Sequence, residues 1–170
     1  MNLQFGPVIR ATCIMIGSHY HCAMDNAKYS GGPCPIARGL ARMGDAWSMM
    51  ILRDAGGGVT RFDQFQKNLG IAPNILTRRL AALTENGLLA RRRYSDHPPR
   101  DDYVLTAAGR DFLPVLYALG AWGARNFGDD AVSRLVQAGS GAAVEPVVVD
   151  RVTGAALAGM DLRIERPAGA

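Results

Sequence analysis

The stretch "APNILTRRLAALTENGLLARRRYSDHPPR", residues 72–100, decides the fold. It opens with Pro73, a residue suited to the first turn of a helix, and carries apolar residues on one helical face until Gly87 stops the pattern. Those residues are Leu76, Leu80 and Leu83, with Ile75 beside them. After Gly87, two strand-like runs, "LLARRRY" and "YVLT", enclose a loop made rigid by two prolines. The stretch therefore predicts one helix with a buried stripe, followed by a β-hairpin.

Three short helices are predicted before this stretch. They run from 35 to 43, from 46 to the glycines at 56–58, and from 62 to 69, and Cys34 and Asp45 stand at the caps of the first two. Their apolar positions recur at helical spacing. The positions are Ile36, Leu40 and Met43, then Trp47, Met50 and Ile51 with Asp54 on the same side, then Phe62, Phe65 and Leu69. Helices, a turn, a further helix and a hairpin in this order are typical of a mainly α winged helix-turn-helix.

A long helix is predicted over 107 to about 127, with Thr106 as its N-cap. Its repeating apolar face carries Phe112, Leu116, Leu119 and Trp122. This face is broader than one small core requires, so we expect it to pack against a second copy of the chain as a dimerisation helix. The alternative is that the helix covers only its own domain.

The sequence divides into three parts. Residues 1–31 form an N-terminal arm without sustained periodicity in its first 23 residues, and we expect either that translation starts at Met24 or that the arm is mobile. Residues 32–127 form the winged helix-turn-helix domain. Residues 128–170 form an extension in which we predict a short helix at 129–139 and a β-hairpin that pairs 147–149 with 162–164.

Composition narrows the class of protein. The 170 residues are 48% hydrophobic, which is enough for a core and argues against disorder, and the net charge is +4. Residues 61–100 alone have a balance of +5 from eight basic and three acidic side chains, which favours a polyanionic partner. The three cysteines, an odd number, fit a reducing cytoplasm, and no apolar run is long enough for a membrane span, so we expect a cytoplasmic protein without a membrane partner.

Base readout is expected from the exposed face of the helix that starts at Pro73, because such a helix fits the major groove of double-stranded DNA. Asn74 suits adenine, Arg78 suits guanine, and Thr77 suits a base edge or a thymine methyl group. Arg79 lies nearer the buried side, where a phosphate contact or an ion pair within the protein is expected instead.

The hairpin adds a basic surface. Strand alternation sends Arg91 and Arg93 to one face and Arg92 to the other, while His97 and Arg100 lie in the proline-containing loop. We expect Arg100 to reach a narrow minor groove and His97 to contact phosphate or solvent. The alternative is that these side chains form an ordinary solvated face.

These motifs together resemble the HxlR family of winged-helix transcriptional regulators, which are relatives of the MarR type. The resemblance covers residues 32–127 and is carried by "CPIARGLARMGDAWSMMILRD", "RFDQFQKNLGIAPNILTRRLAALTENGLL", "HPPRDDYVLTAAG" and "LPVLYALGAWG". It implies a homodimer that binds a promoter palindrome, usually as a repressor, with no enzymatic activity and no cofactor. One departure is Ala72, which stands where the family has serine as a helix cap.

The resemblance also implies a role for Cys34, since some members sense electrophiles or oxidants through a cysteine in the same Cys-Pro motif. A thiol at the start of a helix is favoured as its reactive thiolate. The alternative is that Cys34 is a small buried residue that only caps the helix.

Two rival functions use the same residues differently. A metal-responsive regulator would bind its metal through Cys13, His19, His21, Cys22 and Cys34, although their spacing matches no standard zinc signature. A hydrolase would use Cys34 with His97, although no orienting carboxylate or oxyanion loop accompanies them. We therefore expect no metal site and no catalytic site.

Overall fold

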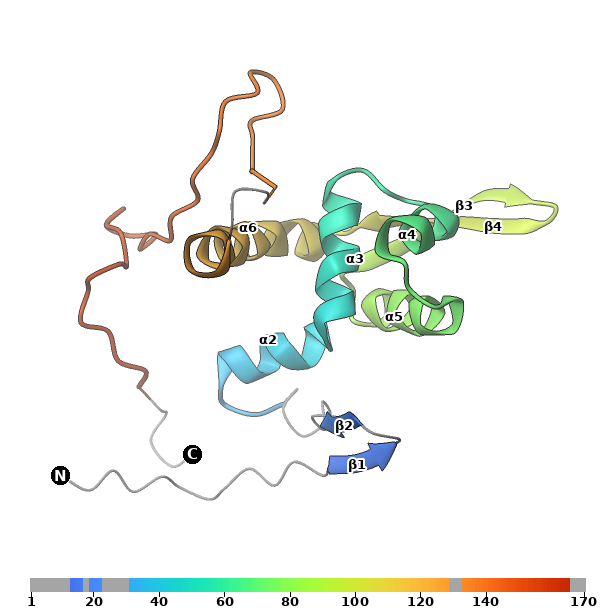
Figure 1. Ribbon diagram of the computed structural model, residues 1–170, viewed down its shortest axis with the longest axis horizontal. Helices are drawn as coiled ribbons and strands as arrows, with labels where there is room; N and C mark the ends of the chain where they lie inside the picture. The colour runs from blue at the N-terminus through green and yellow to red at the C-terminus, as the bar shows by residue number, and fades with distance from the viewer. Residues whose placement is uncertain (1–12, 17–18, 23–30, 129–132, 166–170) are drawn as a thin grey trace. The chain divides into compact units, whose positions relative to one another are not determined.

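The computed structural model describes residues 13–16, 19–22, 31–128 and 133–165 of the chain. The chain divides into two compact units, Met1–Gly44 together with Arg166–Ala170, and Asp45–Glu165. Figure 1 traces the elements of both along the chain.

Among its described residues, the first unit has a small hairpin and one helix. Strands β1 (Cys13–Ile16) and β2 (His19–Cys22) pair antiparallel, with Cys13 opposite Cys22. Both strands lie in the arm that shows no sustained periodicity, and the expectations of a start at Met24 or of a mobile arm stay predictions. Helix α2 (Pro35–Met43) has Cys34 as its N-cap and ends at Gly44, whose φ is 82°. The predicted bounds of this helix are confirmed.

The second unit begins with three helices, all at their predicted places: α3 (Ala46–Gly56), α4 (Phe62–Leu69) and α5 (Pro73–Glu85). The Asp45 carboxylate caps α3 by accepting a hydrogen bond from the Ser48 amide at 3.1 Å. Gly70 ends α4 in the left-handed conformation, φ 60°, which lets the chain turn into α5. Proline at the first position of α5 takes the place of a side-chain cap, because Ala72 offers none.

The core of this unit lies between α3, α4, α5 and the base of the hairpin. The leucine stripe of α5 is buried as predicted, and Ile51, Leu52 and Phe65 are fully buried with it. Helix α3 turns Ile51 and Asp54 inward but leaves Trp47 and Met50 at the surface, 38% and 37% exposed. The four residues keep the spacing predicted for one side of α3, and of these four only Ile51 and Asp54 are buried.

The hairpin consists of β3 (Leu89–Asp96) and β4 (Pro99–Leu105), paired antiparallel, and forms the wing (Figure 1). A break in register falls at Tyr94, between Arg93 and Ser95. The amide of Tyr103 donates a hydrogen bond of 2.8 Å to the carbonyl of Thr60, which attaches β4 to the segment just before α4. This bond fixes the base of the wing to the helix-turn-helix.

Helix α6 (Ala107–Phe127) follows the wing and is capped by Thr106 as predicted. The Thr106 hydroxyl accepts from the Gly109 amide at 3.1 Å and donates to the Gly87 carbonyl at 2.6 Å. Gly109 is buried so closely against the backbone of Leu88 that a side chain has no room there. The first turn of α6 is therefore locked to the junction between α5 and β3.

Two predictions for the extension were wrong. Residues 133–139 are not helical, and residues 129–132 of that predicted helix lie outside the described residues. Within 133–165 the structure has isolated bridges between Val136 and Ala143 and between Val149 and Ala156 in place of a hairpin between 147–149 and 162–164. Local turns compete with strand pairing here: the Asp150 carboxylate accepts from the Val152 amide and from the Thr153 hydroxyl. The bond from the Thr153 hydroxyl is the main reason that the pKa of Asp150 lies below its usual value.

Candidate nucleic-acid interface

The exposed face of α5 is the first part of the candidate interface. Asn74, Thr77, Arg78 and Ala81 are all exposed, on the side of the helix opposite the leucine stripe. The Asn74 side-chain oxygen accepts from the Ile75 amide at 2.9 Å, and the Thr77 hydroxyl donates to the Pro73 carbonyl at 2.8 Å. The amide group of Asn74 keeps its two donors, and Thr77 keeps its acceptor capacity. Arg78 makes no ion pair with another described residue.

Arg79 has a different role from Arg78. Its guanidinium group forms an ion pair with Asp45, the cap of α3, and both side chains are about one-third exposed. Of the two alternatives that the sequence left open for Arg79, the structure has the ion pair within the protein.

The three consecutive arginines are paired along the stem of the wing. Arg92 forms an ion pair with Asp102 at 3.2 Å, whereas Arg91 and Arg93 both reach Asp101, at 3.9 and 2.7 Å. The shared partner of Arg91 and Arg93 agrees with the predicted alternation. Asp101 and Asp102 were not among the predicted site residues. Folding the strands back across the prolines would have placed both opposite the arginines, because β3 and β4 are in that register.

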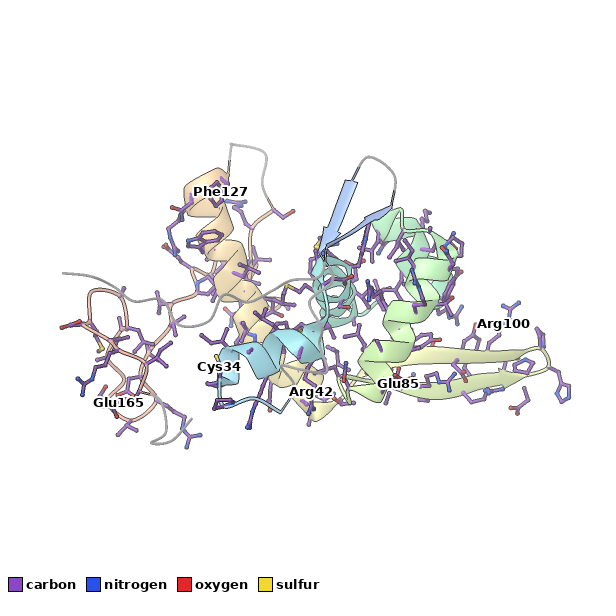
Figure 2. All side chains as sticks on the ribbon, turned by 90° about the horizontal axis from the view of Figure 1, so that it is seen from below. Cys34, Arg42, Glu85, Arg100, Phe127 and Glu165 are labelled. Carbon is purple, nitrogen blue, oxygen red and sulfur yellow. The ribbon has the colours of Figure 1, made fainter. Side chains whose placement is uncertain are left out.

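The tip of the wing carries the other two predicted residues. His97 and Arg100 are exposed, and Arg100 makes no ion pair with another described residue. Figure 2 shows Arg100 at the far end of the hairpin, beyond the end of α5 marked by Glu85. The Ser95 hydroxyl donates to the Pro98 carbonyl at 3.0 Å and so closes the turn that presents them.

An open cleft of about 520 Å³ lies between the start of α4 and the wing, and no sequence motif indicates it. Arg61 and Phe62 line one side, and Tyr94, Arg100 and Tyr103 line the other. The Arg61 guanidinium carbon lies 4.9 Å from the centre of the Tyr94 ring. Arg61 and Tyr94 are 33 positions apart, so only the folded wing brings them together.

Helix α6 presents the apolar face that was predicted to dimerise. Leu119 and Trp122 are 46% and 50% exposed, while Phe112 and Leu116 are half-buried. Val115 and Phe127 are also exposed, and the Phe127 ring meets the Trp122 ring edge to face at 5.1 Å. On the opposite side, Leu113 contacts α3 at Gly56. One side of α6 therefore belongs to the core of its own unit, and the other leaves apolar side chains in solvent.

Cys34 and the predicted metal ligands belong to the first unit. The Cys34 thiol is exposed and makes no capping hydrogen bond, so the alternative of a buried capping cysteine is wrong. The side chains of Cys13, His19, His21 and Cys22 lie outside what the structure describes. Among the side chains that it does describe, no three histidines, cysteines or carboxylates gather as a metal site would require.

Within the described residues, no helix combines the length and apolarity that a membrane crossing needs.

A family model named HxlR-like helix-turn-helix matches residues 42–131, which is more than half of the chain. The chain belongs to the HxlR family. A curated relative from Mycobacterium bovis, the HTH-type transcriptional regulator Mb3122, is 44% identical over 88 residues, which is 52% of this chain and 56% of that protein. The match therefore spans little more than half the length of this relative.

Two solved structures of other proteins share the fold. A crystal structure of PA1607, a protein described as a candidate transcription factor, is 40% identical and covers 82% of this chain and 99% of its own, with a TM-score of 0.73. A structure of the redox regulator HypR in its reduced form is 29% identical over 55% of this chain and 93% of its own, with a TM-score of 0.52. The mainly α fold with a winged helix-turn-helix is thus shown for this HxlR protein.

Proposed function

We propose that this HxlR protein is a sequence-specific, DNA-binding transcriptional regulator. The observation that carries the proposal is the outward face of α5, where Asn74, Thr77 and Arg78 are exposed in the same compact unit as the wing. A helix with such a face fits the major groove, and Arg78 has the donors for a paired contact with guanine.

The wing supplies contacts that do not depend on sequence. Arg100 stands at its tip without an acidic partner among the described residues, which suits a narrow minor groove beside the major-groove site. Arg91, Arg92 and Arg93 are already neutralised in part by Asp101 and Asp102. Their charge is therefore expected to add less to DNA affinity than that of Arg100, and Arg79 is expected to orient α5 through Asp45 rather than touch DNA.

A homodimer completes the proposed regulator. The exposed stripe of α6 that includes Leu119 and Trp122 would be covered by the same stripe of a second copy, with Phe112 and Leu116 at its border. Two copies related by a two-fold axis would present two α5 helices to the half-sites of a palindrome. Repression by occupation of a promoter is the simplest outcome of such binding.

Control by an electrophile or oxidant is a second part of the proposal, and the exposure of Cys34 favours it. The redox regulator HypR is among the proteins of similar fold. A thiol accessible to solvent at the start of a helix can react with a small electrophile, whereas a buried capping cysteine cannot.

Footprinting on the DNA that flanks its own gene tests the main proposal. We expect protection of two half-sites one helical turn apart, with purified full-length protein. A cleavage pattern with no protected site at any protein concentration would contradict sequence-specific binding.

A further inference from the structure

The cleft between α4 and the wing is formed by an irregularity in the wing. Tyr94 occupies the break in register of β3, where a strand turns one side chain away from its regular direction. Its ring lies against the guanidinium group of Arg61, the N-cap residue just before α4. The base of the cleft is held by the hydrogen bond from Tyr103 to Thr60, next to Arg61. The arrangement therefore depends on the folded wing and on the start of α4 together.

Stacking prepares Arg61 to bind an anion. A guanidinium group that lies over an aromatic ring uses its face for the ring and keeps its N–H donors, which point outward in the plane of the group. Arg61 makes no ion pair with another described residue, and its backbone amide, rather than its guanidinium group, donates to Gln64. The ring of Tyr94 thus holds the charge of Arg61 in place without neutralising it.

The charges around the cleft favour a negative occupant. Arg61 and Arg100 line it, and so do Asp63 and Asp101. Asp101 is already paired with Arg93 at 2.7 Å and with Arg91 at 3.9 Å, so its charge is largely offset. Asp63 is exposed and forms no ion pair with another described residue. Two available cations therefore oppose one available anion.

We propose that this cleft holds the sugar–phosphate backbone of duplex DNA, as a contact separate from the base-reading face of α5. Phosphate oxygens would accept hydrogen bonds from Arg61 and Arg100, and the aromatic walls of Phe62 and Tyr103 would face the sugars. Arg61 and Tyr94 are then a clamp that sets the register of the protein on DNA. The inference rests on the proposed function.

The test measures fluorescence anisotropy of full-length protein with a random-sequence duplex and with the operator found by footprinting, from about 50 to 200 mM salt. Arg61→Ala should weaken binding to both duplexes by a similar factor, roughly 5- to 20-fold. It should also reduce the slope of log affinity against log salt concentration by the amount that corresponds to about one phosphate contact. Tyr94→Leu should weaken both about 3-fold because Arg61 loses its platform, whereas Tyr94→Phe keeps the ring and should bind as the wild type does.

Asp63→Asn is the most informative variant because it should change the affinity in the opposite direction. It removes the one acidic side chain of the cleft that has no ion-pair partner among the described residues. We expect tighter binding to both duplexes, about 2- to 5-fold, and damage to the fold cannot produce a gain of affinity. Arg151→Ala, an exposed arginine outside the cleft, serves as the matched control for a loss of one positive charge.

Two outcomes would overturn the inference, and they differ in whether the proposed function is overturned as well. If Arg61→Ala and Asp63→Asn both match the control on both duplexes while Arg78→Ala loses operator affinity, the cleft is not a DNA contact and the proposed regulator stands. If the wild type binds neither duplex, the proposed function and this inference fall together.

Discussion

Arg79 of α5 forms an ion pair with Asp45, the residue that caps α3. One oxygen of the Asp45 carboxylate accepts from the Ser48 amide at 3.1 Å, and the other faces the Arg79 guanidinium group. A single carboxylate therefore fixes the start of α3 and the middle of α5. Because Arg78 directly precedes Arg79 on α5, this link also sets the direction in which the proposed reading face points.

Asp45→Ser separates the two roles of that carboxylate. Serine still caps a helix but cannot pair with arginine, so we expect a loss of about 0.5–1 kcal/mol in the free energy of unfolding. Asp45→Ala removes the cap as well and should cost about 1 kcal/mol more. Urea denaturation of both variants measures the difference. Equal stabilities of Asp45→Ser and wild type would show that the ion pair contributes nothing to the fold.

Gly109→Ala tests the junction between α6 and the wing. A Cβ atom there would lie 2.2 Å from the Leu88 carbonyl oxygen, which belongs to the backbone and cannot turn aside. We expect a loss of about 2–4 kcal/mol in the free energy of unfolding, in spite of the better helix propensity of alanine. Gly123→Ala in the same helix meets open space and should be neutral or slightly stabilising. Similar melting temperatures for the two variants would contradict this packing.

Much of the domain was predictable because its signals are local. The leucine stripe of α5, the caps Asp45 and Thr106 and the stop at Gly70 each act within one or two helical turns, and the structure has these helices where the sequence places them. The ion pairs of the three wing arginines were not predicted, because their partners Asp101 and Asp102 become neighbours only when β3 and β4 pair.

Predictions from the sequence were wrong where two local patterns compete for the same residues. The valines at 147–149 favour a strand, yet the Asp150 carboxylate bonds the amides two and three residues ahead and turns the chain. Conversely, Gly17 and Ser18 separate the short runs "CIMI" and "HYHC", and a glycine-containing pair between two such runs indicates a hairpin even where no longer period exists. The stack of Arg61 on Tyr94 has no signal in the sequence, since a break in register cannot be read from residue types.

Arg78→Ala and Arg100→Ala should separate base readout from backbone contact. Loss of Arg78 removes a paired contact with one base, so we expect a loss of about 1–3 kcal/mol on the operator and relaxed preference at one base pair in each half-site. Loss of Arg100 should weaken operator and random DNA alike and flatten the salt dependence. Binding titrations against operators mutated one position at a time give both quantities. Equal losses on operator and random DNA for both variants would refute this division.

Leu119→Glu should separate the two protomers. In a homodimer that buries the α6 stripe, each large apolar side chain contributes roughly 1.5–3 kcal/mol, and a buried unpaired carboxylate opposes association further. We expect a monomer by light scattering, with weakened operator binding and an unchanged far-ultraviolet spectrum. Tyr117→Glu introduces the same charge about half a turn away on α6 and is the matched control. A wild-type protein that is already monomeric, or a dimeric Leu119→Glu variant, would rule out this interface.

Cys34→Ser tests the proposed sensing of oxidants and electrophiles. The Cys34 thiol is exposed at the start of α2 and makes no capping hydrogen bond, so reagents can reach it and serine can replace it without loss of a contact. We expect diamide or a quinone to lower the operator affinity of the wild type and to leave that of Cys34→Ser unchanged, with mass spectrometry locating the modified residue. Because Cys13 and Cys22 are the other two cysteines, the double variant Cys13→Ser with Cys22→Ser is the control, and it should still respond. Identical responses in wild type and Cys34→Ser would assign the effect to another residue and remove the sensor proposal for Cys34.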